Sequence, residues 1–165
     1  MADTLENGTP STPKDGNYEE SSFTEFPKIW NKHVDIIPVN KNIVIEPGYA
    51  YIFDGENFYK SRENGDFRFI GFDTDTYNSE IEIGEGNVIR IPVAGFFLAY
   101  VDDEYRPGTA LMCGPGGILT KVNESIFKSD PRVFIATYWE RERHEQISDG
   151  TRTVNVNGRH WVKVR

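Results

Sequence analysis

The chain has 165 residues, of which 38% are hydrophobic and 13% aromatic, a composition that suits one folded domain with an appendage. Its formal net charge of −8 argues against nucleic acid as a partner, because phosphate binding requires concentrated lysine and arginine. A single cysteine, Cys113, excludes an intramolecular disulfide and a multi-cysteine zinc site.

Membrane and secretion features are missing from the sequence. No stretch approaches the roughly 20 consecutive apolar residues of a membrane-spanning helix. The first residues, MADTLENG, lack the basic and apolar regions of a secretory signal peptide. We therefore expect a protein that is made in the cytoplasm and stays there, or leaves by lysis or assembly, without a membrane as partner.

Residues 1–22 form a polar stretch rich in Thr, Ser, Pro, Gly, Asn and acidic residues. Its apolar residues are Met1, Ala2, Leu5 and Tyr18. Burying so few side chains cannot offset the backbone entropy that is lost when such a segment becomes ordered. We expect this segment to need a second molecule to hold it, for instance through strand addition to a neighbour.

The next residues are different, because large apolar side chains crowd into eight positions. They are Phe23, Phe26, Ile29 and Trp30, with Pro27 among them. Two interpretations are open: these residues cap the open end of a barrel, or they anchor the chain on a partner, since Trp and Phe dominate interface energetics. We take Phe23, Phe26, Pro27, Ile29 and Trp30 as candidate partner-binding residues. The predicted organisation is an extended N-terminal arm over residues 1–30 and a β domain over residues 31–165.

From residue 34 to residue 90, short β-branched and aromatic runs are separated by turn residues about every 8–12 positions. Asp54-Gly55 and Asn64-Gly65 predict hairpins. The spacing of Phe67 and Phe69 places both on one face of a strand. No helical apolar spacing interrupts the pattern, which indicates an all-β fold, either a small β-barrel or a β-sandwich.

The most apolar strand pattern runs from Val93 to Val101 and is broken only by Gly95. It is too apolar to alternate, so we expect a central strand that is covered on both faces. Pro107-Gly108 fits a type II turn, and residues 114–117 offer another reversal between two further apolar runs.

The C-terminal third continues this pattern. Residues 123–130 predict one short helical turn, residues 132–139 a strand and residues 140–145 a charged projecting loop. Strands over residues 151–156 and 159–165 are predicted to join in a hairpin at Asn157-Gly158, which matches a type I′ turn. In the last strand, period two places His160, Val162 and Val164 on one face, and Trp161, Lys163 and Arg165 on the other.

Residues with catalytic or ligand-binding chemistry are scattered. His33, His144 and His160 show no paired-ligand spacing, and Cys113 lies inside a strand pattern, as expected of a small buried residue rather than a nucleophile. The carboxylates gather at turns or alternate along strands, as solvated charge does. The pair in Asp73-Thr74-Asp75 lacks the ligand series of a calcium loop. We therefore expect no metal, no cofactor and no enzymatic activity.

Two further features leave alternatives open. Tyr49, Tyr51, Tyr138 and Trp139 form either an aromatic platform for sugars or, as is commoner at this spacing on strands, core and cross-strand pairs. Residues 1–26 carry six acidic residues and one lysine, whereas residues 132–165 carry seven basic and four acidic residues. The two ends either meet complementary surfaces, or each other, or are unrelated solvated faces.

Three segments carry a resemblance to a known family: VAGFFLAYVDDEYRPGTALMCGPGGILTK, RVFIATYWERER and VNVNGRHWVKV. They resemble structural proteins encoded in the head-morphogenesis regions of tailed bacteriophages. Residues 93–165 are most similar to the small β-barrel capsid decoration (auxiliary head) proteins. The resemblance implies a non-enzymatic virion protein on the outer capsid surface that binds the major capsid protein and forms trimers or other oligomers with copies of itself. It carries over no functional residue.

From the resemblance and the polar arm we form one hypothesis. The acidic arm with Phe23, Phe26 and Trp30 reaches across neighbouring capsid subunits, where weak contacts repeated over a lattice give avidity. The protein is then made in the host cytoplasm and ends in the virion. The alternatives are a tail, neck or baseplate component, or a carbohydrate- or receptor-binding β module. A small hydrolase would instead require a concave pocket with convergent carboxylates.

Overall fold

The computed structural model describes residues 33–39, 41–71, 80–148 and 150–164. The chain divides into two units, Met1–Asn31 and Lys32–Arg165, and the first of these lies outside the described residues. The predicted N-terminal arm over residues 1–30 therefore lies outside them, as do the candidate partner-binding residues Phe23, Phe26, Pro27, Ile29 and Trp30. The segment Asp73-Thr74-Asp75 does so too.

The described residues are mainly β-structure, so the predicted all-β class is confirmed. The strands in chain order are β1 (His33–Pro38), β2 (Ile43–Ile45), β3 (Tyr51–Phe53), β4 (Phe58–Lys60), β5 (Phe69–Gly71), β6 (Ile81–Ile83), β7 (Val88–Tyr100), β8 (Ala110–Cys113), β9 (Leu119–Lys121), β10 (Ala136–Arg141), β11 (Gln146–Ser148), β12 (Thr153–Asn155) and β13 (Arg159–Val164). The helical elements are the 3-10 helices η1 (Pro115–Gly117) and η2 (Pro131–Val133) and the α-helix α2 (Glu124–Ser129).

The largest sheet has six antiparallel strands in the order β1-β7-β13-β10-β8-β9. Its outer strands, β1 and β9, do not pair with each other within the described residues, so the sheet is not the closed barrel that we considered. β9 nevertheless returns to the end of β7 through one parallel bridge between Val101 and Leu119. The Asp102 N–H also donates to the Leu119 carbonyl at 2.9 Å. Five of the six strands, β7, β13, β10, β8 and β9, therefore curl until the last meets the end of the first, and we call them the five-stranded curl. We call the contact between β9 and the end of β7 the seam.

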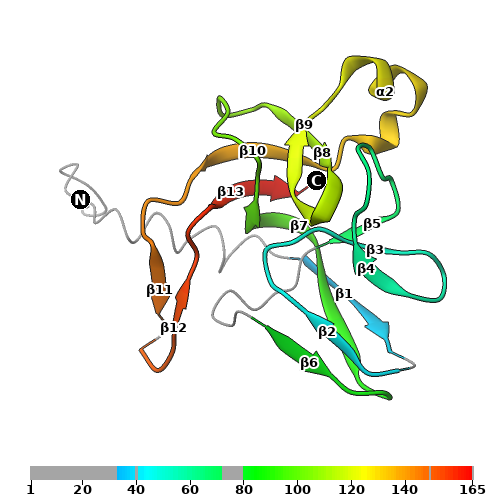
Figure 1. Ribbon diagram of the computed structural model, residues 1–165, viewed down its shortest axis with the longest axis vertical. Coiled ribbons are helices and arrows are strands. Elements are labelled where there is room, and N and C mark those ends of the chain that lie inside the picture. Colours follow the sequence, from blue (N-terminus) through cyan, green and yellow to red (C-terminus); the bar gives the residue numbers. More distant parts are fainter. Residues whose placement is uncertain (1–32, 40, 72–79, 149, 165) are drawn as a thin grey trace, which may run out of the picture. The chain divides into compact units, whose positions relative to one another are not determined.

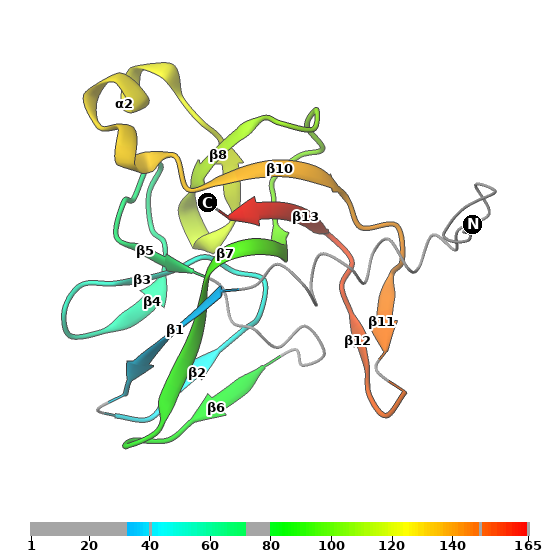
Figure 2. The same cartoon turned by 180° about the vertical axis from the view of Figure 1, so that it is seen from behind.

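Strand β7 connects two regions of the domain. It pairs with β1 from Val88 to Ala94 and with β13 from Gly95 to Tyr100, and Figure 2 shows β1 alongside its first half. Gly95, at the changeover, has a φ of 117°, which residues with a side chain rarely adopt. In the second half, Phe97 and Leu98 enter two different cores. The prediction of a strand covered on both faces is thus confirmed.

Three clusters of buried side chains make up the interior. The first lies within the five-stranded curl and takes side chains from β7, β8, β9, β10 and β13, including Leu111, Leu119 and Val162. The second is formed by Val39, Ile45, Tyr51 and Ile89. The third covers the other face of β7 and β13 and includes Leu98 and Trp161. Val162 and Trp161 therefore point to opposite faces, as the period of two predicts.

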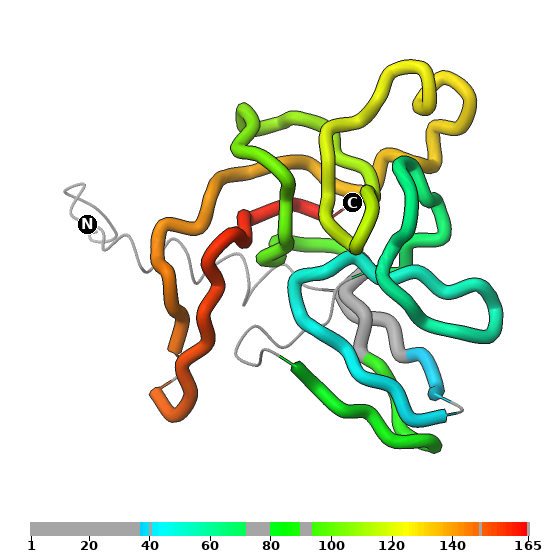
Figure 3. The backbone as a smooth tube through the Cα atoms, viewed as in Figure 1, coloured from blue at the N-terminus to red at the C-terminus, as the bar shows by residue number. Residues whose placement is uncertain are grey.

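One long, bent hairpin forms the C-terminal part of the domain. β10 pairs with β13 and β11 pairs with β12, and Figure 1 shows the second pair continuing from the ends of the first. The backbone tube in Figure 3 follows this hairpin, orange on one side and red on the other. Two backbone hydrogen bonds span the bend: the Glu142 N–H donates to the Arg159 carbonyl at 3.3 Å, and the Val156 N–H to the Glu145 carbonyl at 2.8 Å.

The predicted hairpin at Asn157-Gly158 is wrong. The last paired residues of the hairpin are Ser148 and Thr153, so the chain reverses between them. Gly158, with a φ of 87°, lies instead in the bend, where the Arg159 N–H donates to the Val156 carbonyl at 2.9 Å. A tight turn does form there, but the strands on its two sides, β12 and β13, belong to different sheets.

The three-stranded sheet corrects two further predictions. β3 lies between β4 and β5, so Asp54-Gly55 joins paired strands as predicted, whereas Asn64-Gly65 does not. The Gly65 N–H donates instead to the Cys113 carbonyl at 2.9 Å, which ties this loop to β8. Phe67 precedes β5 and is 46% exposed, while Phe69 packs against the first core, so the two do not share a strand face.

Most of the other local predictions agree with the structure. The predicted helical turn is α2, whose first turn is capped by the Asn123 side chain, which accepts from the Ile126 N–H at 3.1 Å. The reversal at residues 114–117 contains η1. Gly108 has a φ of 94° and the Thr109 N–H donates to the Arg106 carbonyl at 3.1 Å, as in a type II turn. The strand predicted at residues 132–139 begins later, at Ala136, because η2 occupies its start.

Candidate interaction surface

The cysteine is unsuited to nucleophilic chemistry. Cys113 is fully buried in the first core, and burial raises the pKa of its thiol to about 12. The thiolate is the reactive form, so it is absent at physiological pH. The prediction of a small buried residue is confirmed.

Histidines and carboxylates do not gather into a metal site in the part of the chain that the structure describes, where no group of three or more such side chains could hold an ion. The acidic corner at residues 102–104 has structural partners instead. The Asp102 carboxylate accepts from the Tyr105 hydroxyl and from the Thr120 hydroxyl, both at 2.7 Å. Because Asp102 follows β7 and Thr120 lies in β9, this carboxylate fastens the seam.

The predicted charged loop at residues 140–145 contains a buried carboxylate, which corrects its interpretation as purely solvated charge. Glu142 is 7% exposed. One carboxylate oxygen accepts from the Trp161 indole Nε1–H at 3.0 Å, and the other lies 2.9 Å from both the backbone N–H and the ring Nδ1 of His144. The bend of the hairpin turns Glu142 back over β13, so this side chain holds the bend in place.

A second buried polar pair joins β10 to β13. The Tyr138 hydroxyl lies 2.7 Å from His160 Nδ1, and both residues are buried. Burial raises the pKa of Tyr138 to about 12, so its hydroxyl keeps the proton. Burial, followed by the positive charge of Arg141, lowers the pKa of His160; Arg143 acts in the same direction, while Glu104 and Asp103 oppose it.

This pair predicts loss of stability in acid. Below pH 6.5 His160 is protonated in the unfolded chain, whereas in the folded chain it stays neutral until the pH reaches its lowered pKa. The free energy of unfolding should therefore fall as pH drops through this window, by about 1.4 kcal/mol for each unit between the two pKa values. Urea denaturation between pH 5 and pH 8 measures this. In His160→Asn the free energy of unfolding should no longer depend on pH in this window, whereas in His144→Asn it should depend on pH as in the wild type. The same pH dependence in the wild type and in His160→Asn would contradict the role given to His160.

The four aromatic residues considered as a sugar platform do not lie together on the surface. Tyr51 and Tyr138 are buried, and Tyr49 stacks on Tyr100 with ring centroids 4.3 Å apart. For these three residues the core and cross-strand interpretation is confirmed. Trp139 is the exception, because it is 45% exposed.

Trp139 lies at a β-bulge between β10 and β13. In the pairing of β10 with β13, Tyr138 is opposite Val162 and Glu140 is opposite Trp161, which leaves Trp139 as the extra residue. A bulge of this kind re-aims a side chain and bends the strand. The Trp139 ring meets Phe96 edge to face at 5.0 Å, and Lys163 Nζ lies 5.8 Å from the Phe96 ring centroid. We call these three side chains, from β10, β7 and β13, the Trp139 surface.

Other large apolar side chains are exposed singly in the described residues: Val44 at 48%, Phe67 at 46% and Phe127 at 37%. Scattered exposed apolar residues are normal on a soluble domain, so exposure alone does not mark them as functional. Trp139 differs from Val44 and Phe127 because it meets a second aromatic ring, Phe96, which Lys163 approaches in turn.

Sequence reasoning treated Trp139 only as part of an aromatic set. Its neighbours on the surface come from strands far apart in the chain, and a bulge leaves no regular trace in the period of two. No helix within the described residues is long and apolar enough to cross a membrane. A scan against protein-family models gives no match to the sequence, and a search of the curated proteins gives none either.

Proposed function

We propose that this chain is a virion structural protein that decorates the outer surface of a tailed-bacteriophage capsid, binds the major capsid protein and stabilises the head. A sequence resemblance and the fold class support the proposal. Residues 93–165 resemble small β-barrel decoration proteins, and the fold of the described residues is all-β. The single structural observation that carries it is the Trp139 surface, because exposed Trp beside a second aromatic ring is typical of the anchor residues in protein interfaces.

A non-enzymatic role agrees with where reactive side chains lie in the described part of the chain. The thiol of Cys113 is buried, Glu142 is engaged by Trp161 and His144, and His160 is engaged by Tyr138. The proposed partners are the major capsid protein and further copies of this chain. Contacts of modest strength suffice on a capsid, because a repeated lattice multiplies them.

The test is binding to undecorated particles, followed by sedimentation and measurement of the number of copies per particle. Trp139→Ala should weaken binding by about 10–100-fold, the range of an interface hot spot, and deletion of residues 1–30 should lower occupancy further. The matched control is Val44→Ala, which truncates a side chain of similar exposure, 48% against 45%, and should bind as the wild type does. Wild-type occupancy for both Trp139→Ala and the deletion would remove these two surfaces from the proposal.

Failure of the wild type itself to bind heads would overturn the proposed identity. Co-purification with tails, necks or baseplates would then point to the tail-component alternative. One observation favours a carbohydrate-binding module as the second candidate: Trp139 meets Phe96, and the exposed Lys163 lies with its Nζ 5.8 Å from the Phe96 ring centroid, so a polar side chain stands beside the aromatic pair. Glycan binding that is lost in Trp139→Ala would support that candidate.

A further inference from the structure

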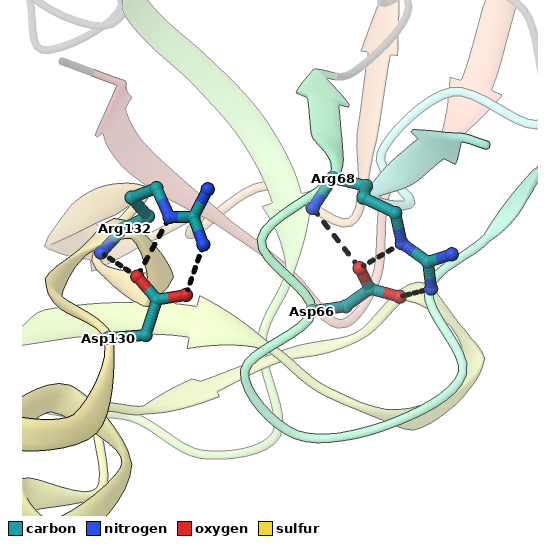
Figure 4. A network of polar contacts seen from close by, with 4 residues as sticks. All are labelled: Asp66, Arg68, Asp130 and Arg132. Carbon is teal, nitrogen blue, oxygen red and sulfur yellow. Dashed lines mark hydrogen bonds and ion pairs between the residues drawn. The ribbon is translucent and has the colours of Figure 1, made fainter. Parts of the chain in front are cut away.

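Two arginines of the domain are held by the same local arrangement, in Asp66-Phe67-Arg68 and in Asp130-Pro131-Arg132 (Figure 4). In each, the arginine backbone N–H and its Nε–H donate to one oxygen of the aspartate two residues earlier, and Nη2 donates to the other oxygen. The three distances are 3.1, 3.1 and 3.0 Å for Asp66 with Arg68. They are 3.0, 2.9 and 2.8 Å for Asp130 with Arg132. We call each arrangement a clamp.

In both clamps the guanidinium is more exposed than the carboxylate that holds it. The Asp66 side chain is 1% exposed and that of Arg68 is 41% exposed. The Asp130 side chain is 26% exposed and that of Arg132 is 68% exposed. Two parallel bonds fix the plane of each guanidinium, so little conformational freedom remains to be lost when a ligand binds to it.

Phe67 links the two clamps, because it belongs to one of them and its ring contacts the arginine of the other. It stands between Asp66 and Arg68 in the sequence, and the guanidinium carbon of Arg132 lies 4.0 Å from the centroid of its ring. The ring is 46% exposed although Phe69, two residues later, packs against the core. We call Phe67, Arg68 and Arg132, with their two aspartates, the clamp surface.

The unused donors of the clamp surface define the chemistry of a ligand. A guanidinium has five N–H groups, and each clamp uses one on Nε and one on Nη2, which leaves three. Such pairs of N–H groups match the two oxygens of a carboxylate. The exposed ring of Phe67 beside them suits an apolar side chain. The two aspartates leave no net positive charge on the clamp surface, so a ligand is held by directed hydrogen bonds to the free N–H groups and not by overall charge, whereas a nucleic acid needs uncompensated positive charge.

We propose that the clamp surface binds a partner protein through an acidic segment in which an apolar side chain stands beside carboxylates. Phe67 receives the apolar side chain, and the free N–H groups of Arg68 and Arg132 donate to the carboxylates. This binding does not depend on the proposed place of the protein on a capsid, because it rests on the geometry of the two clamps alone.

The test uses the full chain and a fluorescein-labelled acidic peptide with the sequence Gly-Glu-Phe-Glu-Phe-Glu-Gly, measured by fluorescence anisotropy. The wild type should bind it, and should bind the peptide with glutamine in place of glutamate at least about tenfold more weakly, because charge-assisted hydrogen bonds are lost. Arg132→Gln and Phe67→Ala should each weaken binding about tenfold. Arg132→Lys should behave like Arg132→Gln, since lysine keeps the charge but lacks the planar fork.

The control variant is Arg106→Gln, which removes an exposed arginine outside the clamp surface and should bind as the wild type does. Urea denaturation of every variant checks that the fold is intact, and Arg132 is preferred to Arg68 because Asp66 is buried and needs its partner. Three results would overturn the proposal: no binding of the acidic peptide, an equal loss in Arg106→Gln, or equally tight binding of a single-stranded oligonucleotide. Self-association that Arg132→Gln abolishes would also overturn it, in favour of a second copy of the chain.

Discussion

Replacement of Leu119 by alanine is expected to lower the free energy of unfolding by about 2–5 kcal/mol. Leu119 is fully buried in the first core, and its backbone forms the seam with Val101 and Asp102. Truncation removes the apolar contacts of Leu119 and leaves a cavity at the seam, where β9 meets the end of β7. Urea denaturation measures the loss, and faster hydrogen exchange of the Asp102 amide should accompany it, since that amide donates to the Leu119 carbonyl.

The matched control for this variant is Val44→Ala. Val44 is 48% exposed, so its truncation should change stability by no more than about 0.5 kcal/mol. If Leu119→Ala costs as little as the control, β9 is not packed as described and the seam does not hold the curl together.

Glu142→Ala is expected to cost about 2–4 kcal/mol, although it lies in a run of charged residues that looks solvated in the sequence. Its carboxylate is the acceptor for the Trp161 indole N–H and for two donors of His144. Without it, the indole N–H in the third core is left buried without a partner, and an unsatisfied buried donor is costly. The bend between β10 and β11 loses its side-chain support as well.

Glu145→Ala tests this account, because Glu145 belongs to the same charged run and is exposed. Its removal should change stability by no more than about 0.5 kcal/mol. Both variants are compared by urea denaturation, with near-ultraviolet circular dichroism, to which Trp161 contributes, as a second readout. Equal stabilities of Glu142→Ala and Glu145→Ala would show that the carboxylate does not support the bend.

Local chemistry was sufficient to predict most of the strands, although not β11. The apolar run predicted as a strand at Val93–Val101 falls on the second half of β7, which ends at Tyr100, and Asn123 caps the predicted helical turn. These predictions hold because backbone preference, alternation of side chains and capping depend on residues close together in the chain. Trp161 and Val162 pointed to opposite cores for the same reason.

Strand pairing was where sequence reasoning failed. Asn64-Gly65 and Asn157-Gly158 both carry hairpin chemistry, yet neither joins two paired strands. A turn dipeptide indicates that the chain reverses or kinks at that point. It does not indicate which strand the next segment pairs with. The true reversal of the C-terminal hairpin lies between Ser148 and Thr153, where Asp149-Gly150 carries the same kind of dipeptide. That dipeptide is the feature of the sequence that indicates the reversal.

The surfaces were still less predictable. Trp139 of β10 meets Phe96 of β7, and the Phe67 ring contacts Arg132, which lies 65 positions later in the chain. Each clamp joins residues two positions apart and is therefore local. The contact between Arg132 of one clamp and Phe67 of the other cannot be predicted from the sequence around either clamp. Glu142 shows the converse, because one glutamate of a charged run became buried when the hairpin bent over Trp161.

By itself, then, the sequence determined the class of fold, the positions of most strands and turns, and the burial of Cys113, all of which depend on composition and short-range periodicity. The tertiary structure alone decided which strands pair, that the six-stranded sheet stays open except at the seam, and which side chains meet at the Trp139 and clamp surfaces. The physical reason is that these features arise from contacts between residues distant in the chain. Such contacts depend on how whole strands bend and pack, and not on the preferences of neighbouring residues.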